Sequence, residues 1–347
     1  MYATGVHAFG GENMSVSVAV LGCGRIGQVH GRAIASSQDA RLIAVADPFP
    51  KAANSMAELH GTEVRSIEQI ASAGDIDAVI ICTPTDTHAD LIEKFVDRGK
   101  DVFCEKPIDL DATRVRQCLS KVEASGQTLM VGFNRRFDPH FQAMKARIDA
   151  GDIGKVEMVS ITSRDPGLPP ASYIERSGGI FRDMTIHDFD VARWLLGEEI
   201  DTVVAMGSVL VDSDISDLGD FDSASVMMKT KSGRQAAISN SRRATYGYDQ
   251  RIEVHGSEGT ITAQNLREHQ IELATKNGFS RPPLMDFFMD RYASAYSAEI
   301  EAFARSVQEK SAPPTTGMDG LKALLLADAA NLSIAESRVV SLAELDG

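Results

Sequence analysis

One stretch near the amino terminus indicates the fold, Ser17-Val18-Ala19-Val20-Leu21-Gly22-Cys23-Gly24-Arg25-Ile26-Gly27. Its apolar run predicts a buried strand and residues 26–36 have a helical composition, so the pattern G-x-G-x-x-G stands between a strand and a helix. In that context the first glycine permits a tight turn, the second lets backbone approach a pyrophosphate, and the third lets helix and strand pack closely. The helix N-terminus offers free N–H groups to phosphates. The stretch therefore predicts a dinucleotide-binding turn.

An acidic residue at the end of the next strand refines this prediction. Asp47 lies 20 residues after Gly27, directly after an apolar run at 41–46. Its carboxylate would accept hydrogen bonds from ribose hydroxyls and repel a 2′-phosphate, and Pro48 follows it rather than Arg or Lys. We therefore expect NAD rather than NADP. The alternative is a plain glycine turn beside a solvated aspartate.

The rest of the chain extends this pattern and then changes it. Strands are predicted at 17–21, 41–46, 76–82, 101–104 and 129–133, with helices at 26–36, 51–60, 91–99 and 112–125. Apolar strands that alternate with helices predict a parallel, doubly wound sheet. Beyond Asn134 the strands have period-2 character, at 156–163, 203–211, 224–231, 235–241, 251–255 and 260–263, with helices at 139–150, 285–310 and 317–337. This second part predicts a mostly antiparallel sheet with one open face.

Length and composition set limits on what the protein is. The 347 residues suit two domains. We expect a loose tail at 1–13, a dinucleotide-binding domain at 14–134, and a substrate-binding and oligomerisation domain at 135–347 whose last helix packs back on the first domain. The net charge of −14 argues against nucleic-acid binding. No apolar run approaches the roughly 20 residues of a membrane span.

The cysteines and the first residues bear on the compartment. The four cysteines show no C-x-x-C spacing, and we expect small buried hydrophobes in a reducing cytoplasm: Cys23, Cys82, Cys104 and Cys118. Residues 1–13 contain no Lys or Arg and no apolar core, so they do not resemble a secretory signal.

Two loops at predicted strand ends carry polar groups. Thr83-Pro84-Thr85-Asp86-Thr87-His88 follows the strand at 76–82, and such loops line the ligand crevice of a doubly wound sheet. Thr85 or Asp86 could instead cap the next helix. Glu105-Lys106-Pro107 follows the strand at 101–104, where a partly desolvated lysine could polarise a substrate oxygen. A surface lysine in a turn is the alternative.

A third motif combines a carboxylate with an imidazole. Asp183 and His187 are four residues apart in a segment, 183–196, that is predicted to be helical, so they would share a face. A carboxylate that orients an imidazole raises its basicity, as a general base requires. Two alternatives remain: Asp183 caps the helix while His187 is a core histidine, or the pair binds a metal, for which no third ligand is evident.

Together, the glycine turn, Glu105-Lys106-Pro107 and Gly178-Gly179 followed by Asp183-x-x-x-His187 resemble the glucose–fructose oxidoreductase/inositol dehydrogenase/rhizopine-catabolism (Gfo/Idh/MocA) family. The resemblance runs from about Ser17 to the end of the chain. Residues 132–138, 163–166 and 179–190 look most like the inositol 2-dehydrogenases of this family. Ser177 departs from the pattern, since many members have a third glycine there.

The resemblance implies an α/β fold, an N-terminal Rossmann domain plus an α+β domain with an open-faced sheet, and a homo-oligomer (dimer or tetramer) formed through that sheet. It implies an NAD-dependent dehydrogenase that oxidises myo-inositol, without a metal. The alternatives are a dehydrogenase of another cyclic polyol or sugar, such as scyllo-inositol, chiro-inositol or glucose, and a non-catalytic dinucleotide sensor.

The resemblance also implies residue roles. His187 would take the hydroxyl proton, Asp183 would orient His187, and Lys106 would polarise the reacting hydroxyl. The expected cofactor-binding residues are Gly22, Gly24, Arg25, Ile26, Gly27, Asp47, Thr83, Pro84, His88 and Glu105. Beside the catalytic three, the expected substrate-binding residues are Arg136, Asp165, Tyr246 and Tyr248. Arg136 could equally pair with Asp138 or a glutamate, and the tyrosines could be core or interface residues.

Overall fold

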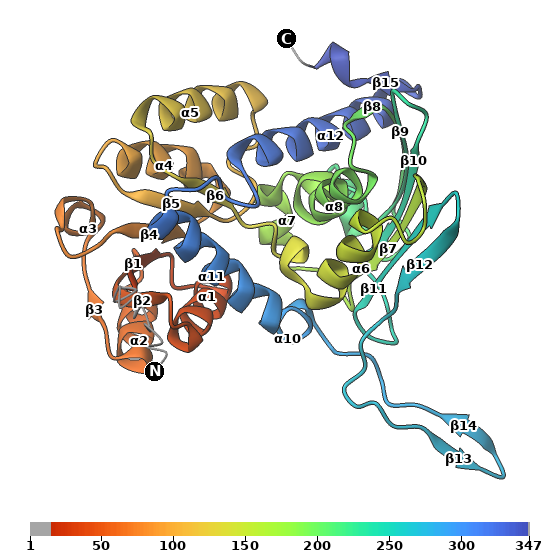
Figure 1. Ribbon diagram of the computed structural model, residues 1–347, viewed down its shortest axis with the longest axis horizontal. Coiled ribbons are helices and arrows are strands. Elements are labelled where there is room, and N and C mark those ends of the chain that lie inside the picture. The colour runs from red at the N-terminus through yellow and green to blue at the C-terminus, as the bar shows by residue number, and fades with distance from the viewer. Residues whose placement is uncertain (1–14, 346–347) are drawn as a thin grey trace, which may run out of the picture.

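The computed structural model describes residues 15–345, and the predicted tail at 1–13 lies outside this range. Two sheets stand side by side, each covered by helices (Figure 1). One sheet has six strands and the other seven. The predicted fold class, a doubly wound parallel sheet followed by a mostly antiparallel one, is confirmed.

The first sheet is parallel throughout, in the order β3-β2-β1-β4-β5-β6. Its strands are β1 (Val16–Leu21), β2 (Ala40–Ala46), β3 (Glu63–Val64), β4 (Ala78–Ile81), β5 (Asp101–Cys104) and β6 (Leu129–Val131). Its helices are α1 (Arg25–Ser36), α2 (Pro50–His60), α3 (Ile67–Ser72), α4 (His88–Val96) and α5 (Ala112–Ser125), with a 3₁₀ turn η1 (Thr85–Thr87). The strand order reverses between β1 and β4, and ligands bind such sheets at the carboxyl ends of the strands beside this switch point.

The second sheet has the order β12-β11-β7-β10-β9-β8-β15, in which only β7 and β10 run parallel. Its strands are β7 (Val156–Arg164), β8 (Ile200–Ser208), β9 (Ser223–Thr230), β10 (Gln235–Ser241), β11 (Asp249–Gly256), β12 (Gly259–Ala263) and β15 (Val340–Ser341). Helices α6 (Pro139–Asp149), α8 (Ile186–Leu196) and α12 (Gly317–Glu336) pack against this sheet.

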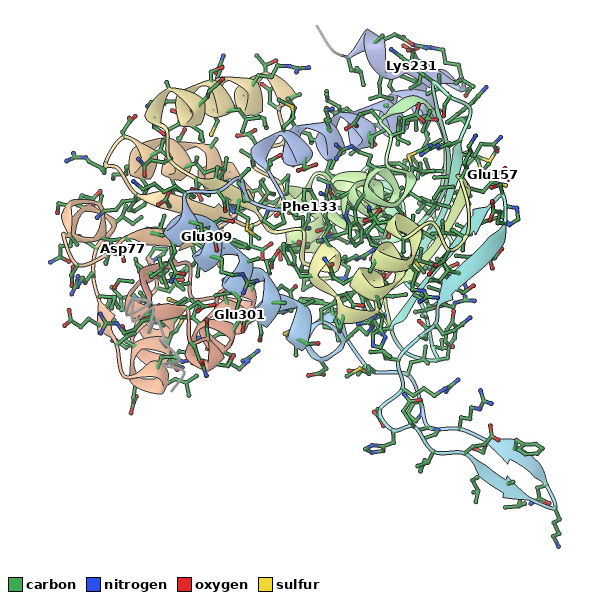
Figure 2. All side chains as sticks on the ribbon, in the orientation of Figure 1. Asp77, Phe133, Glu157, Lys231, Glu301 and Glu309 are labelled. Carbon is green, nitrogen blue, oxygen red and sulfur yellow. The ribbon has the colours of Figure 1, made fainter. Side chains whose placement is uncertain are left out.

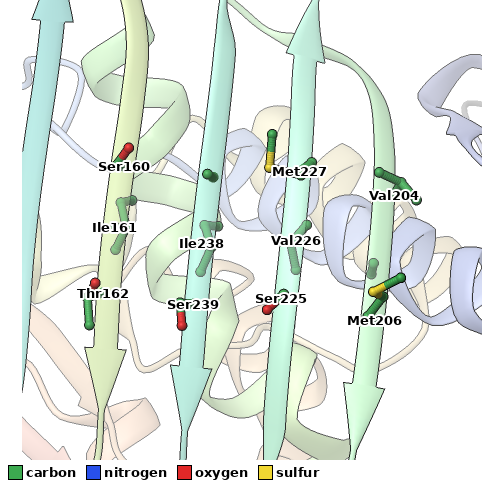
Figure 3. Close-up of a pocket in the computed structure, with 12 residues that line it drawn as sticks. Ser160, Ile161, Thr162, Val204, Met206, Ser225, Val226, Met227, Ile238 and Ser239 are labelled. Carbon is green, nitrogen blue, oxygen red and sulfur yellow. The ribbon is translucent and has the colours of Figure 1, made fainter.

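The other face of the second sheet is open. Along β9, Ala224, Val226 and Met228 are buried, whereas Ser225 and Met227 between them are exposed. Figure 3 shows the face, where Met206 and Val204 of β8 stand beside Met227. Serine and threonine side chains alternate with these apolar groups, and no residue of the candidate site below lies in this depression.

Most predicted elements are found within three residues of their expected ends, but the helix expected at 285–310 is broken. Residue Phe287 is extended, α10 spans Phe288–Arg291, and α11 spans Ala293–Glu309. The break falls at Tyr292, whose buried ring packs at 90° to that of Tyr248, so tertiary packing overrides the local helical preference. Helix α11 packs on α1, whereas α12 contacts α5 and β6 as well as β8, so α12 links the two sheets.

Several short elements were not predicted. They are the 3₁₀ turns η2 (Asn134–Phe137) and η4 (Leu342–Glu344), the π-helical turn η3 (Phe181–Thr185), helices α7 (Ala171–Ser177) and α9 (Asp214–Asp217), strands β3 and β15, helix α3, and the hairpin β13 (Leu273–Thr275) and β14 (Gly278–Ser280). The hairpin projects from the rest of the molecule, and the residues of both its strands are exposed to solvent (Figure 2). Of these elements, η3 and α7 matter most for the site.

Candidate active site

The glycine turn after β1 has a different constraint at each position. Gly22 has φ +92°, and a Cβ there would lie 2.6 Å from the carbonyl oxygen of Cys82. At Gly27 a Cβ would lie 2.0 Å from the carbonyl oxygen of Gly22, so helix and strand touch here. A Cβ on Gly24 would meet no atom within 4 Å. The protein itself does not require glycine at residue 24, which is what a turn that admits a ligand's phosphates would show.

The start of α1 suits an anion. Gly24 is the N-cap, no side chain caps the helix, and the first turn, which begins with Arg25 and Ile26, contains no acidic residue. The N–H groups of this turn are therefore free to bind phosphate oxygens. Arg25 is exposed, and its guanidinium lies 6.0 Å from the ring centroid of Phe287.

Asp47 lies beside this turn. Its Oδ2 accepts a hydrogen bond from the backbone N–H of Cys23 (2.7 Å), and its Oδ1 accepts from the N–H of Phe49 (2.8 Å). The carboxylate is thus held at the edge of the glycine turn by two backbone donors. This is where an acidic residue binds the ribose of a dinucleotide in a doubly wound fold.

Two of the predicted cofactor-binding residues, His88 and Glu105, are buried and have partners within the protein. The ring of His88 is 1% exposed, with Nδ1 2.7 Å from the carbonyl oxygen of Pro107 and Nε2 2.7 Å from that of Thr83. Buried Glu105 lies 2.7 Å from Nε2 of His30 in α1. These two side chains join the strand-end loops to each other and to α1. In the same loop, the hydroxyl of half-buried Thr83 lies 2.7 Å from that of Thr87, and Pro84 is exposed.

Lys106 and Asp183 meet although they come from different sheets. The ammonium of Lys106, at the end of β5, donates to the backbone carbonyl of Asp183 (2.8 Å) and lies 3.4 Å from its Oδ1. The same Oδ1 accepts from the hydroxyl of Tyr173 in α7 (2.8 Å). Both side chains of the Lys106–Asp183 pair keep some exposure, 13% and 15%. The pair can therefore touch a bound molecule.

His187 is the third of the residues predicted to take part in catalysis. Its half-buried ring lies edge-on to that of Phe133, with 6.2 Å between the centroids, and Phe133 is labelled in Figure 2. Burial, followed by the positive charges of Lys106 and Arg135, lowers the pKa of His187 well below its usual value. The imidazole is consequently neutral at physiological pH, and within residues 15–345 its buried Nδ1 has no hydrogen-bond partner.

The predicted pairing of Asp183 with His187 is not what the structure contains. No hydrogen bond joins the two side chains among the described residues, and the oxygens of Asp183 face Lys106, Tyr173 and Arg242 instead. Asp183 lies in the π-helical turn η3, whereas His187 lies in α8. The carboxylate of Asp183 is directed to the cations Lys106 and Arg242 and to the hydroxyl of Tyr173, which leaves none of its contacts within residues 15–345 to the imidazole.

Arg136 is held by two aspartates. Its Nε donates to Asp190 (2.7 Å) and its Nη2 to Asp319 (2.9 Å), so its partners are neither Asp138 nor a glutamate. With these bonds and burial, the guanidinium has little left to offer a substrate hydroxyl. The neighbouring Arg135 instead pairs with Asp188 beside His187.

The remaining predicted substrate residues divide into two groups. Asp165 follows β7, and burial together with the charge of Asp183 raises its pKa to about 7. Tyr248 is buried, and no hydrogen bond to its hydroxyl occurs in the described part of the chain. Both therefore have polar groups available. Tyr246, by contrast, is 48% exposed and donates to Asp249 (2.6 Å) while it accepts from Arg164 (3.1 Å).

Comparison with known proteins decides the family. Residues 16–133 match an oxidoreductase family with an NAD-binding Rossmann fold, and residues 141–262 match the GFO/IDH/MocA C-terminal domain. The chain belongs to the Gfo/Idh/MocA oxidoreductase family. The predicted family, its oxidoreductase class and its NAD cofactor are thereby confirmed.

Several members of the Gfo/Idh/MocA family resemble this chain along its length. Inositol 2-dehydrogenase of Rhizobium meliloti is 62% identical over 330 residues, which cover 95% of this chain and 100% of the relative. Myo-inositol 2-dehydrogenase of Thermotoga maritima is 43% identical, with 95% and 99% covered. The crystal structure of scyllo-inositol dehydrogenase from Lactobacillus casei, with bound NAD(H) and scyllo-inositol, superposes with a TM-score of 0.89 at 30% identity, covering 95% of this chain and 100% of that one.

Other features of this Gfo/Idh/MocA chain concern metals, membranes and thiols. Between residues 15 and 345, no three His, Cys, Asp or Glu side chains gather as metal ligands do. In the same range, no helix is long and apolar enough to cross a bilayer. All four cysteines are free and buried.

Three site residues of this family member were not foreseen from the sequence: Tyr173, Arg135 and Arg242. Tyr173 lies on a helix of seven residues, too short for a periodicity signal. Arg135 adjoins Arg136, and nothing local distinguishes which of the two faces the site. Arg242 follows β10, and the parallel pairing of β10 with β7 brings it beside Asp165.

Proposed function

We propose that this chain oxidises myo-inositol to 2-keto-myo-inositol with NAD. The observation that carries the proposal is the contact of the Lys106 ammonium with Asp183 just beyond the carboxyl end of β5, with the neutral imidazole of His187 near enough for the charge of Lys106 to lower its pKa. The relatives named for inositol dehydrogenation support the substrate class. NAD, when bound, supplies the hydride acceptor at C4 of its nicotinamide.

Each of the three residues has a defined task in this proposal. His187 accepts the proton of the reacting hydroxyl, which a neutral imidazole can do and an imidazolium cannot. Lys106 donates a hydrogen bond to the same oxygen and stabilises the negative charge that develops on it. Asp183 acts on Lys106, because its carbonyl and carboxylate fix the ammonium. Loss of the proton makes it easier for hydride to leave the same carbon.

Recognition of the remaining hydroxyls is assigned to two groups. Asp165 and Tyr248 have polar atoms without a side-chain hydrogen-bond partner among the described residues, and a polyol would provide partners. A buried polar group left unmatched costs about 1–3 kcal/mol, so such groups discriminate between hydroxyl patterns. Arg136 and Tyr246 are not included, because the Arg136 guanidinium already donates to Asp190 and the Tyr246 hydroxyl to Asp249.

Scyllo-inositol is the second candidate substrate. The structure solved with scyllo-inositol bound resembles 95% of this chain, and scyllo- and myo-inositol differ only in the configuration at one carbon. We further propose that the protein is cytoplasmic, since its four thiols are free, and that copies associate through the open face of the second sheet.

The test is NADH formation by the purified protein with myo-inositol, scyllo-inositol, chiro-inositol and glucose, with NADP in parallel. We expect the highest kcat/KM with myo-inositol and NAD. A preference for another of these compounds would leave the proposed roles of Lys106, Asp183 and His187 unchanged and would change the assigned substrate. Tight NAD binding without turnover of any of them would contradict the proposed reaction and favour a sensor.

A further inference from the structure

Arg242 is a buried cation that the proposed reaction does not yet use. It is 1% exposed and directly follows β10, whose last residue, Ser241, pairs in parallel register with Arg164 of β7. The carboxyl ends of these two strands therefore deliver Arg242 and Asp165 to the same edge of the sheet. A buried guanidinium is costly unless carboxylates surround it.

Two carboxylates share this guanidinium. Nη2 of Arg242 lies 3.6 Å from Oδ2 of Asp183 and 3.6 Å from Oδ2 of Asp220. Neither its Nε nor its Nη2 has a hydrogen-bond partner among residues 15–345. The contacts are therefore electrostatic, and they are strong because water is largely excluded from them.

Asp220 connects the guanidinium to the turn that carries Asp183. Its Oδ1 accepts from the backbone N–H of Ile180 (2.8 Å), directly before the π-helical turn. Gly179 has φ +84°, and a Cβ there would lie 2.8 Å from the same oxygen. Asp220 thus fixes the start of the turn while Arg242 attracts the side chain of Asp183 within it.

The two oxygens of Asp183 consequently face different cations. Oδ1 faces Lys106 and accepts from Tyr173, whereas Oδ2 faces Arg242. A carboxylate that is attracted at both oxygens cannot rotate freely. The other charged group near the guanidinium is Asp165, whose carboxyl the charge of Arg242 also stabilises in its ionised form.

We propose that Arg242 is a positioning residue of this active site: it holds one oxygen of Asp183 so that the other stays on Lys106. The inference rests on the proposed function, because its consequence is a correctly aimed Lys106 ammonium. Arg242 itself touches none of the reacting atoms in this scheme. A purely structural role, in which the guanidinium only fills and neutralises the interior, is the competing explanation.

The experiment compares R242M, which keeps bulk without charge, with R242K, which keeps charge. The matched control is R291M, because Arg291 is also buried, pairs with one aspartate, Asp138, and has its Nε and Nη2 unpartnered. For R242M we expect kcat to fall by about 100-fold, as misplacement of a catalytic group by 1 Å does. The Kd for NAD should stay within about twofold, and R242K should recover part of kcat. R291M should lose thermal stability with kcat nearly intact.

Equal losses of kcat in R242M and R291M, or no recovery in R242K, would overturn the proposal. Crystal structures of wild type and R242K, with R242M added if it folds, give a readout that needs no turnover. We expect the Asp183 carboxylate to move away from Lys106 in R242M and to stay in R242K. An unmoved carboxylate in R242M, or a displaced one in R242K, would also overturn it. If wild type turns over none of the inositols, the proposed function fails while this structural comparison still decides the role of Arg242.

Discussion

The ammonium of Lys106 donates to the backbone carbonyl of Asp183 at 2.8 Å, across 77 residues of sequence and between two separate sheets. Lys106 lies two residues beyond β5 of the parallel sheet, and Asp183 lies in the π-helical turn that leads into α8, which packs on the second sheet. This contact joins the carboxyl end of the parallel sheet to the segment that precedes α8. In the proposed reaction, catalysis should therefore depend on it.

Replacement of Lys106 by methionine tests that dependence. K106M removes the donor to the developing alkoxide, so we expect kcat/KM for inositol to fall by about 100- to 1,000-fold, while the Kd for NAD, measured by fluorescence, stays within about twofold. The control is K100M, because Lys100 is also buried but donates to the carbonyls of Ala73 and Ile76. K100M should lower the melting temperature rather than kcat. Wild-type kcat/KM in K106M would contradict the proposed role of Lys106 in the reaction.

The glycines of the first turn provide a paired test of cofactor binding. G24A adds a methyl group where the protein has no atom within 4 Å, so the melting temperature should change little. The methyl group would occupy space that a pyrophosphate needs, and we expect the Kd for NAD to rise at least about tenfold, or about 1.4 kcal/mol. G27A places its methyl 2.0 Å from a carbonyl oxygen and should lower the melting temperature instead. Unchanged NAD affinity in G24A would contradict the assigned phosphate site.

Asp47 should set the preference between the two nicotinamide cofactors. In D47A the negative charge beside the glycine turn is lost, so a 2′-phosphate is no longer repelled. We expect the ratio of kcat/KM with NAD to that with NADP to fall by about tenfold or more. D47N is the companion variant, since it keeps an oxygen for one of the two backbone donors at Cys23 and Phe49. A ratio that stays the same in both variants would count against a ribose contact.

The sequence predicted what depends on local pattern. Strand β5, helix α5 and strand β10 were predicted with the observed ends, because short apolar runs between turn residues are local signals. The glycine turn and Asp47 were also found at the expected place. These features depend on residues close in sequence, and the doubly wound topology then brings their strand ends together.

What the sequence did not reveal depends on contacts between distant elements. The i, i+4 argument for Asp183 and His187 considered only their own helix, whereas Lys106, Tyr173 and Arg242 from other elements hold the carboxylate of Asp183. The choice between Arg135 and Arg136 was decided by Asp188 and Asp190, which lie more than 50 residues away. Such pairings follow from packing, and no local pattern encodes them.

Arg136 should matter for stability rather than for substrate binding. Removal of one member of a buried ion pair leaves an uncompensated charge and costs about 3–5 kcal/mol. We expect R136M to lose that much free energy of unfolding in urea, while the KM for inositol stays within about twofold. R65M is the control, because Arg65 pairs with Asp75 at the surface and such pairs contribute about 0–1 kcal/mol. A large rise in the KM for inositol without loss of stability would show instead that Arg136 binds the substrate.

Asp165 should make the stability of the protein depend on pH. Burial and the neighbouring Asp183 raise its pKa from 3.8 to about 7 in the folded protein. Between about pH 4 and pH 7 the unfolded chain loses the proton of this carboxyl while the folded chain keeps it, so folding is progressively disfavoured as pH rises. In D165N the group cannot titrate. We therefore expect the melting temperature of wild type to fall relative to D165N between pH 4 and pH 7, with a constant difference above pH 7. D165N should also raise the KM for inositol, because the carboxyl is one of the groups left for substrate hydroxyls. If the two melting curves stay parallel over this pH range, Asp165 does not carry the raised pKa, and its side chain must be ionised in the folded state by Arg135 and Arg242.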